Sequence, residues 1–185
     1  GVEISKTSLR ASSIKTAGTG GKTSKLENSN TSIGIDIFTD STLDTNSNND
    51  DLGSIYISDQ IQEQNGDIEL VGVGGTGLEY SGGVFSTAKI DSAGSILIKG
   101  QGGSGKKDIY GVALETTKTD IDNGAITAEQ KIIVEGKGGT GRNIKDSTGI
   151  FLSNVEVNAG SGIYINGEAG SSSGENSKDV YLNGT

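Results

Sequence analysis

A glycine-rich phrase recurs along the chain with similar neighbours each time, and this repeat constrains the fold more than any other feature. Three copies have the form Gly-x-Gly-Gly-Thr/Ser-Gly, and two looser copies lie on either side of them. A phrase that returns at intervals of roughly thirty residues is typical of proteins built from stacked structural repeats. The copies are Gly72-Val-Gly-Gly-Thr-Gly77, Gly100-Gln-Gly-Gly-Ser-Gly105, Gly136-Lys-Gly-Gly-Thr-Gly141, Gly18-Thr-Gly-Gly21 and Gly167-Glu-Ala-Gly170.

Short apolar segments flank each copy of the phrase. Most carry aliphatic residues at i and i+2, the period of a strand with one buried face, and a 3.6-residue apolar stripe is missing. The sequence therefore predicts an all-β fold. Segments before the phrase are Ile14-Lys-Thr16, Ile68-Glu-Leu70, Ile96-Leu-Ile98, Ile132-Ile-Val134 and Ile163-Tyr-Ile165. Segments after it are Gly34-Ile-Asp-Ile37, Gly83-Val-Phe-Ser86, Gly111-Val-Ala-Leu114, Gly149-Ile-Phe-Leu152 and Asp179-Val-Tyr-Leu182. A third set is Ser41-Thr-Leu43, Ala88-Lys-Ile90, Thr119-Asp-Ile121 and Val155-Glu-Val157.

Three strands per copy, with apolar positions that match between copies, predict a single-stranded parallel β-helix of about five coils. Gly, Asn and Asp would form the corners, because these residues tolerate tight turns. We expect one domain over residues 1–185, with insertions at Asp44–Leu52 and Gly124–Gln130. The expected inward columns are Ile68/Ile96/Ile132/Ile163, Val84/Val112/Ile150/Val180 and Ile90/Ile121/Val157.

Composition excludes several classes of function. The net charge of −9 argues against nucleic acid as a partner, since a basic stripe is the expected footprint there. No apolar run approaches the ~20 residues of a membrane-spanning helix. The chain has no Cys, so it has no disulfide framework. It has no His, which removes Ser-His-Asp and Cys-His catalysis and most zinc chemistry. The strand-like Val2-Glu-Ile4 predicts that any signal peptide lies outside this chain.

The glycine phrases also match Gly-x-Gly-x-x-Gly, the pattern of a dinucleotide-binding turn. That site needs a helix N-terminus after the glycines to hold the phosphates, and no helix is expected here. Gly21-Lys22-Thr23 supplies the end of a phosphate-binding loop, but Thr16 stands where its first glycine belongs. Stacked corners of a repeat explain the phrases better than a cofactor site.

Carboxylates are the remaining candidates for chemistry. Asp120 and Asp122 would share one face of a strand about 6.7 Å apart, a separation that suits an acid pair of a polysaccharide-cleaving enzyme. Asp50 with Asp51, and Glu156, are further candidates. Asp91, Asp122 and Asn158 recur at one corner, however, where a turn-forming side chain is the simpler interpretation.

The polar insertion Asp44–Asp51 is the one candidate for calcium, because it clusters carboxylate and amide oxygens. It lacks the glycine and terminal glutamate of a helix-loop-helix calcium site, so a solvated loop is the favoured interpretation. The repeat-type calcium motif fails, because Glu79, Lys107 or Asn143 takes the place of its aspartate. We assign no catalytic, cofactor-binding or metal-binding residue and expect no enzyme activity.

The outward positions of the predicted strands are partly apolar. The first strand would present Glu69/Leu97/Ile133/Tyr164, and the second would present Asp36/Phe85/Ala113/Phe151/Tyr181. Neither column is the regular threonine array of an ice-binding face. Together they could form one exposed apolar patch, which either contacts a partner or lies beneath a covering loop.

The units Ile-x-Ile-x-Gly-x-Gly-Gly-x-Gly followed by Gly-Val-x-Leu resemble the large secreted β-helix exoproteins of bacteria, the filamentous-haemagglutinin-like adhesins. The resemblance covers nearly the whole chain and is clearest from Gly66 to Thr185. It implies a right-handed parallel β-helix and export to the cell surface, and it names no ligand. A secretion domain of that family is not visible, so the chain could be a segment of a longer repeat protein.

These observations predict an extracellular structural or adhesive module. We expect it to present loops and a flat face to a glycan or host-surface ligand. We also expect its terminal coils to pair with further coils of a longer chain or with another copy, end to end, because exposed strand edges need a partner. A polysaccharide-cleaving enzyme with a carboxylate pair is the alternative.

Overall fold

The computed structural model describes residues 8–9, 14–19, 31–37, 56–57, 60–63, 67–76, 80–87, 89–105, 108–115, 125–140, 146–171 and 176–184. Within these residues the chain forms only β-strands and their connections, as predicted, and no helix. The strands pair in three parallel sheets, which we name sheets A, B and C.

Sheet C has five strands, sheet A six and sheet B five. In spatial order, sheet C contains β15 (Gly162–Glu168), β12 (Lys131–Lys137), β9 (Ile96–Gln101), β6 (Ile68–Val73) and β2 (Ile14–Thr19). Sheet A contains β16 (Val180–Asn183), β13 (Ser147–Ser153), β10 (Ile109–Glu115), β7 (Tyr80–Ser86), β3 (Thr31–Ile37) and β4 (Tyr56–Ile57). Sheet B contains β1 (Ser8–Leu9), β5 (Gln60–Glu63), β8 (Lys89–Ser92), β11 (Ile126–Ala128) and β14 (Val157–Ala159).

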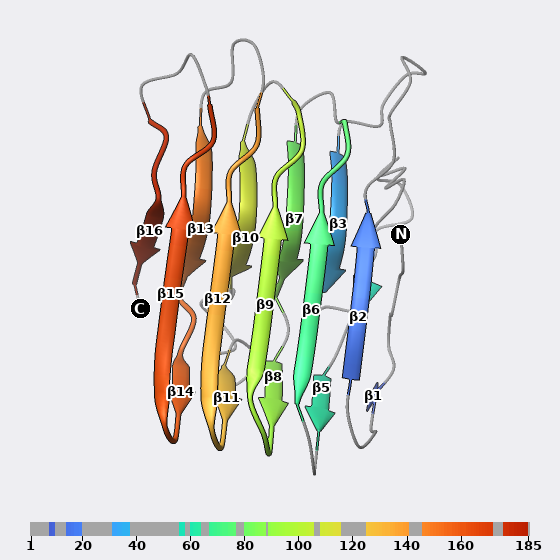
Figure 1. The fold of residues 1–185 in the computed structure, drawn as a ribbon, viewed down its shortest axis with the longest axis vertical. Helices are drawn as coiled ribbons and strands as arrows, with labels where there is room; N and C mark the ends of the chain where they lie inside the picture. Colours follow the sequence, from blue (N-terminus) through green and yellow to red (C-terminus); the bar gives the residue numbers. More distant parts are fainter. Residues whose placement is uncertain are drawn as a thin grey trace.

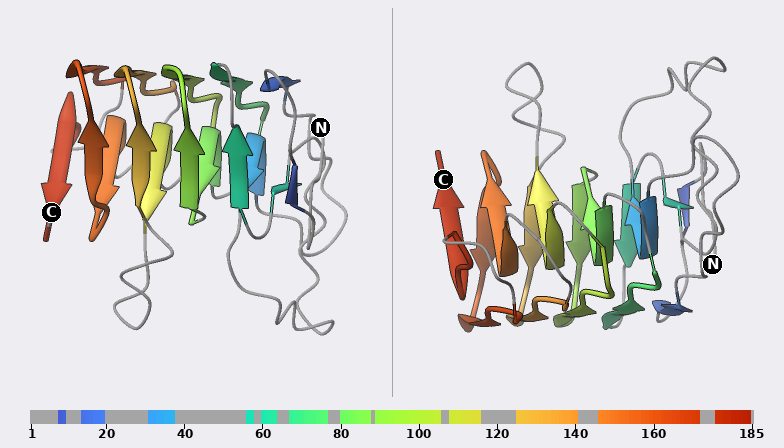
Figure 2. Two further views of the ribbon diagram at one scale, coloured as in Figure 1. Left: turned by 90° about the horizontal axis from the view of Figure 1, so that it is seen from below. Right: turned by 90° about the horizontal axis from the view of Figure 1, so that it is seen from above.

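The chain visits the three sheets in turn. It passes through β6, β7 and β8, then β9, β10 and β11, then β12, β13 and β14, and finally β15 and β16. We call one passage through sheets C, A and B a coil and number the coils by the five strands of sheet C. Figures 1 and 2 show sheets C and A as two layers with the short strands of sheet B along one side. Strands β2 and β15 lie at opposite ends of sheet C, so the coils stack in the order of the sequence.

Aliphatic side chains from successive coils line up between the layers and form the core. The first two predicted columns are confirmed: Ile68, Ile96, Ile132 and Ile163 are register partners along sheet C. Val84, Val112, Ile150 and Val180 are register partners along sheet A. One core cluster contains Ile68, Leu70, Val84, Ile90, Ile96, Ile98, Val112, Leu114, Ile126, Ala128, Ile132, Val134, Ile150, Leu152 and Val155.

The first glycine of each phrase is a strand residue whose missing side chain lets sheets C and A approach closely. A Cβ atom on Gly100 would overlap the carbonyl group of Gly111, and one on Gly136 would overlap that of Gly149. Positive φ among the described glycines occurs only at Gly162 and Gly184, so the described glycines of the phrase do not supply the positive φ expected at corners from the sequence. Its glycines are needed because backbone occupies the space that a side chain would take.

The third predicted column is wrong at one position. Ile126 of β11 pairs in register with Ile90 on one side and with Val157 on the other, and so occupies the place assigned to Ile121. The segment Gly124–Gln130 therefore contains the sheet B strand of its coil and is not an insertion. Ile121 itself lies outside the described residues.

The first coil also departs from the prediction. Ile61 of β5 pairs with Ile90, so β5 takes the third-strand place assigned to Ser41–Leu43. Residues 41–43 and the predicted insertion Asp44–Leu52 lie outside the described part of the chain. A further strand, β4, follows β3 in sequence but pairs with the edge of β3 that faces away from β7.

Candidate functional site

The outer face of sheet C carries regular columns of side chains across four coils. Register pairing confirms the predicted column Glu69/Leu97/Ile133/Tyr164. Alternate residues of a strand point to the same face, so two further columns lie on this face beyond the first. Both hold mainly polar and charged residues. They are Val71/Lys99/Glu135/Asn166 and Val73/Gln101/Lys137/Glu168.

Ion pairs link neighbouring coils along these columns. Lys99 Nζ lies 2.9 Å from Glu135 Oε2, and Lys137 Nζ lies 2.9 Å from Glu168 Oε1. Each pair joins one strand of sheet C to the next, so both fix the relative position of adjacent coils. All four side chains are well exposed, which limits the strength of each pair to ~1 kcal/mol or less.

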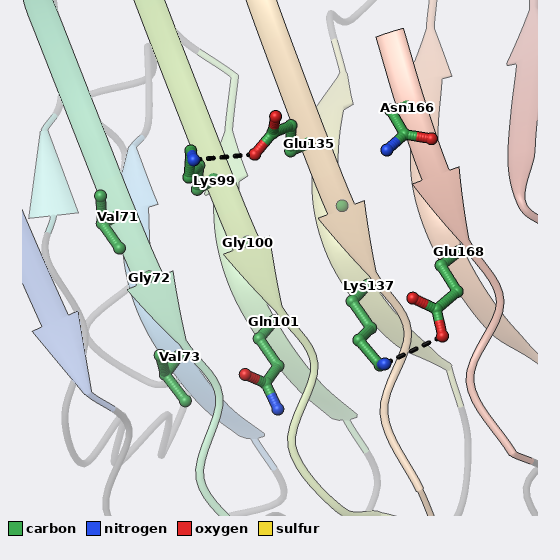
Figure 3. A pocket seen from close by; sticks show the side chains of 11 residues that line it. Val71, Gly72, Val73, Lys99, Gly100, Gln101, Glu135, Lys137, Asn166 and Glu168 are labelled. Carbon is green, nitrogen blue, oxygen red and sulfur yellow. Dashed lines mark ion pairs between the residues drawn. The ribbon is translucent and has the colours of Figure 1, made fainter.

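A shallow, open groove of about 380 Å³ lies on this face between the two polar columns (Figure 3). The backbone of Gly72, Gly100 and Gly136 lines it. Gln101 and Asn166 offer amide groups beside the charged pairs. The groove can therefore donate and accept hydrogen bonds with an extended ligand, and it has the shape of a contact surface more than of an enclosed reaction site.

The outer face of sheet A carries an aromatic row. The Phe151 ring centroid lies 5.2 Å from that of Tyr181 in a stacked arrangement and 5.3 Å from that of Tyr110. Lys178 Nζ lies 3.9 Å from the centre of the Tyr181 ring, a distance that favours a cation–π contact. Register pairing confirms the predicted column Asp36/Phe85/Ala113/Phe151/Tyr181, within which Ala113 is fully buried.

The predicted single apolar patch is wrong because its two halves lie on different sheets. Leu97, Ile133 and Tyr164 belong to sheet C, whereas Phe151 and Tyr181 belong to sheet A. Sheets C and A pack against each other, so their outer faces point in opposite directions (Figure 2). The described residues thus form two separate faces of different chemistry. The face of sheet C has a groove between charged columns beside the column Leu97/Ile133/Tyr164, and the face of sheet A has the aromatic row.

A ladder of hydroxyl groups in the glycine phrases went unrecognised in the sequence. Thr76, Ser104, Thr140 and Ser171 form successive parallel bridges from coil to coil. The Ser104 hydroxyl donates a hydrogen bond of 3.2 Å to Thr76 Oγ1. The signal was present in the repeat, since three of these residues follow the paired glycines of their phrase.

Buried serines stabilise the same corner. Ser81 Oγ donates to the Gly75 carbonyl oxygen at 2.9 Å, and Ser147 Oγ donates to the Gly139 carbonyl oxygen at 3.0 Å. Both serines are almost fully buried, so these bonds satisfy groups that water does not reach. Ile109 occupies the same register position in the coil between them.

Two of the predicted carboxylates, Asp91 and Glu156, lie within the described residues. Asp91 and Asn158 do share one column at the corner, but its position in the coil between them is Thr127 and not Asp122. Glu156 accepts a 2.8 Å hydrogen bond from Asn158 Nδ2 and is exposed. Asp120, Asp122, Asp50, Asp51 and the candidate calcium loop Asp44–Asp51 lie outside the described residues, as does Gly21-Lys22-Thr23.

Burial changes the pKa of one carboxyl group on the outer side of sheet A. Desolvation raises the pKa of Glu115, the last residue of β10. Its register partner is Ser153 in the next coil. Among the described residues no second carboxylate is a register partner of Glu115, so the raised pKa does not indicate an acid pair.

The fifth coil exposes side chains at positions that are buried in the second, third and fourth coils. Ile163 is 48% exposed and Leu182 is 55% exposed, and Val180 is also exposed. These residues continue the inward columns of sheets C and A. No described strand pairs with the outer edges of β14, β15 or β16.

Among the described side chains, no group of three His, Cys, Asp or Glu residues is placed to hold a metal ion. The same residues contain no helix long and apolar enough to cross a membrane. Comparison with protein-family models, with curated proteins and with solved structures finds no match.

Proposed function

We propose that the chain is a right-handed parallel β-helix that serves as an extracellular structural and adhesive module of a bacterial surface protein. Three parallel sheets visited in turn, with in-register aliphatic columns, support the β-helix. The glycine repeat and its aliphatic neighbours support a relationship to the filamentous-haemagglutinin-like exoproteins, from which handedness and location at the cell surface follow.

The observation that carries the proposal is the outer face of sheet C. Strands β9, β12 and β15 place charged and amide side chains in straight columns on this face, and Val71 and Val73 of β6 continue the columns. Backbone ladders and the aliphatic core fix the spacing of the columns at about 4.8 Å from coil to coil. A surface of this kind is preorganised to contact an extended ligand, such as a glycan chain or a host-surface protein.

The module acts by rigidity and display. Contacts between sheets C and A leave no room for side chains at the glycine column, so the two layers have a single close separation. Binding groups on the outer face then lose little conformational freedom when a ligand docks. In this proposal no carboxylate has a chemical role.

Binding of the labelled protein to arrayed neutral and acidic oligosaccharides and to cultured epithelial cells tests this function. The variant Lys99→Ser/Tyr164→Ser removes one cation and one aromatic ring from the outer face of sheet C. We expect it to weaken binding about tenfold or more, because exposed aromatic and cationic groups dominate contacts of this kind. Glu156→Gln changes an exposed carboxylate next to β14 of sheet B, away from this face, and is expected to bind like the wild type.

The matched control is Lys178→Ser/Tyr181→Ser, which removes the same two residue types from the opposite face, on sheet A. It should leave binding within about twofold of the wild type. Equal loss in both double variants would contradict a role for sheet C. Release of reducing sugar from any arrayed polysaccharide would contradict the structural and adhesive assignment itself.

A further inference from the structure

The two ends of the coil stack differ in sheet A. At the N-terminal end, β4 pairs with the outer edge of β3, with Tyr56 opposite Asp36 and Ile57 opposite Ile37. At the C-terminal end, β16 has β13 on one side and no described strand on the other. A strand of two residues covers one end of the sheet, and no described strand covers the other end, which we call the open end.

The open end combines exposed aliphatic side chains with strand edges that no described strand pairs with. Ile163 and Leu182 are about half exposed, and their counterparts Ile132 and Leu152 in the preceding coil are almost fully buried. The outer edges of β14, β15 and β16 carry backbone donors and acceptors that a parallel strand could pair with. What would satisfy them is another coil with aliphatic residues at the same register positions.

The first coil of this same chain has that pattern. Ile14 holds the register position of Ile68, Gly18 that of Gly72, and Ile35 that of Val84. Placing β2 of one copy on β15 of another puts Ile14 opposite Ile163, Gly18 opposite Gly167 and Thr19 opposite Glu168. The glycine column of sheet C, which sets the separation of the layers, would continue without interruption.

Sheet A matches in the same arrangement. With β16 of one copy on β3 of the next, Val180 faces Ile35, Tyr181 faces Asp36 and Leu182 faces Ile37. In the isolated chain, Tyr56 and Ile57 of β4 hold the places that Tyr181 and Leu182 would take. Both strands offer a tyrosine followed by an aliphatic residue, so β4 copies the part of β16 that it would exclude.

We infer that a second copy of this chain docks head to tail on the open C-terminal coil, and that β4 is a displaceable plug on the acceptor edge. β16 of the copy with the open end replaces β4 on β3 of the docking copy. The exchange extends the pairing from two register pairs at β4 to three at β16 and adds six between β15 and β2. It rests on the proposed structural role and gives that role an assembly step with its own control.

Charge sets the conditions for docking. Each copy carries a net charge of −9, so two copies repel each other at low ionic strength. Docking through apolar columns and backbone pairing is therefore expected to strengthen with added salt, since screening weakens the repulsion. A docking driven by ion pairs between the copies would show the opposite dependence.

Cysteine cross-linking tests the register directly, because the natural chain contains no cysteine. Thr19→Cys and Glu168→Cys are prepared as two single variants and oxidised separately and as a mixture. Head-to-tail docking places these two positions on adjacent parallel strands, about 4.8 Å apart and within the range of a disulfide. We expect a disulfide-linked dimer in the mixture and monomers in each separate sample.

Two outcomes would overturn the inference. Cross-linking of Glu168→Cys alone would show that the open ends meet each other. Monomers in every sample, at protein concentrations up to the solubility limit and in added salt, would show that the open coil does not accept a second copy.

The plug is tested by removing its backbone donors. Tyr56→Pro/Ile57→Pro is placed in the Thr19→Cys background and mixed with Glu168→Cys. We expect this mixture to cross-link at about a tenfold lower protein concentration, because about two hydrogen bonds from β4 to β3 no longer compete with β16. The matched control Tyr56→Phe/Ile57→Val keeps both backbone N–H groups and should cross-link like its parent. Equal concentrations for both variants would overturn the plug.

A substitution on the donor strand guards against a folding failure of the proline variant. Leu182→Lys changes a side chain that is already 55% exposed, so the isolated chain should remain folded by circular dichroism. In the Glu168→Cys background it is expected to lose cross-linking by about tenfold or more, because it places a charge against the apolar column. Unchanged cross-linking would overturn the docking. Loss of assembly with intact ligand binding would leave the adhesive proposal standing. Intact assembly without ligand binding would contradict only the adhesive proposal.

Discussion

The fourth and fifth coils carry the same aliphatic pattern, but only the fourth coil buries it. Ile132 and Ile163 are register partners in sheet C, yet Ile132 is fully buried and Ile163 is 48% exposed. Leu152 and Leu182 repeat this contrast in sheet A. Burial in this protein therefore comes from having a neighbouring coil on both sides, and the strand's own sequence does not supply it.

This comparison has an energetic consequence. In a stack of repeats, stability is approximately a sum of the contributions of single repeats and of the contacts between neighbours. An interior coil has two such contacts, and the fifth coil has one among the described residues. Equivalent substitutions should therefore cost more in the interior than at the end.

The largest effect is expected from an interior glycine. A Cβ atom at Gly100 would overlap the Gly111 carbonyl group, which is backbone and cannot move aside without separating sheets C and A. Gly100→Ala should lower the free energy of unfolding by ~3 kcal/mol or more, as measured by urea denaturation. The neighbouring exposed variant Gln101→Ala is the control and should change it by less than ~0.5 kcal/mol.

Paired isoleucine substitutions break the comparison most simply. Ile132→Ala should lower the free energy of unfolding by roughly 2–5 kcal/mol, because it leaves a cavity in a fully buried column. Ile163→Ala should cost about 1 kcal/mol or less, because water already reaches that side chain. Equal costs for the two variants would show that the fifth coil is covered in solution.

A smaller effect is expected from Glu115, which has a neighbouring coil beside it. Burial disfavours its ionised form and raises its pKa, so the folded-state pKa exceeds the unfolded-state pKa. The stabilisation is present below the unfolded-state pKa and is lost as pH rises through the folded-state pKa. Glu115→Gln should therefore raise the melting temperature at neutral pH, and the gain should shrink in acid. A gain that grows in acid would contradict this assignment.

The smallest effect is expected from the ion pairs on the outer face of sheet C. Lys99→Ala and Lys137→Ala should each lower the free energy of unfolding by about 0.2–1 kcal/mol at low salt, since both pairs are exposed. The losses should nearly vanish at ~1 M salt. Lys137 pairs with the fifth coil and Lys99 with the fourth, so similar values would show that the outer face does not share the contrast found in the core.

Sheets C and A could be predicted from the sequence because their strands combine a fixed glycine with alternating aliphatic residues. Sheet B could not be predicted as well, because its strands are short and several segments match their pattern. The spacing between the sheet B strand and the next sheet C strand would have favoured Ile126 over Ile121. Ile90 precedes Ile96, Ile126 precedes Ile132 and Val157 precedes Ile163 by the same six residues.

The outer faces were harder to predict than the core. Sequence placed Phe151 and Leu97 outward, but which outward residues share a face depends on how the layers pack. The close approach at Gly100 and Gly111 puts sheets C and A back to back, so Leu97 and Phe151 face in opposite directions. The role of β4 was also invisible, since a two-residue strand that pairs backward along the stack leaves no periodic signal.

Amide hydrogen exchange of the monomeric chain, resolved by residue, tests the central contrast most directly. In a parallel sheet, alternate residues of a strand bond to opposite neighbours, so an interior strand has every amide paired and an edge strand only every second one. We predict slow exchange along all of β9 and β12 and alternating slow and fast exchange along β15. Uniform protection of β15 in the monomer, or exchange of β9 and β12 as fast as at the edge, would contradict the account.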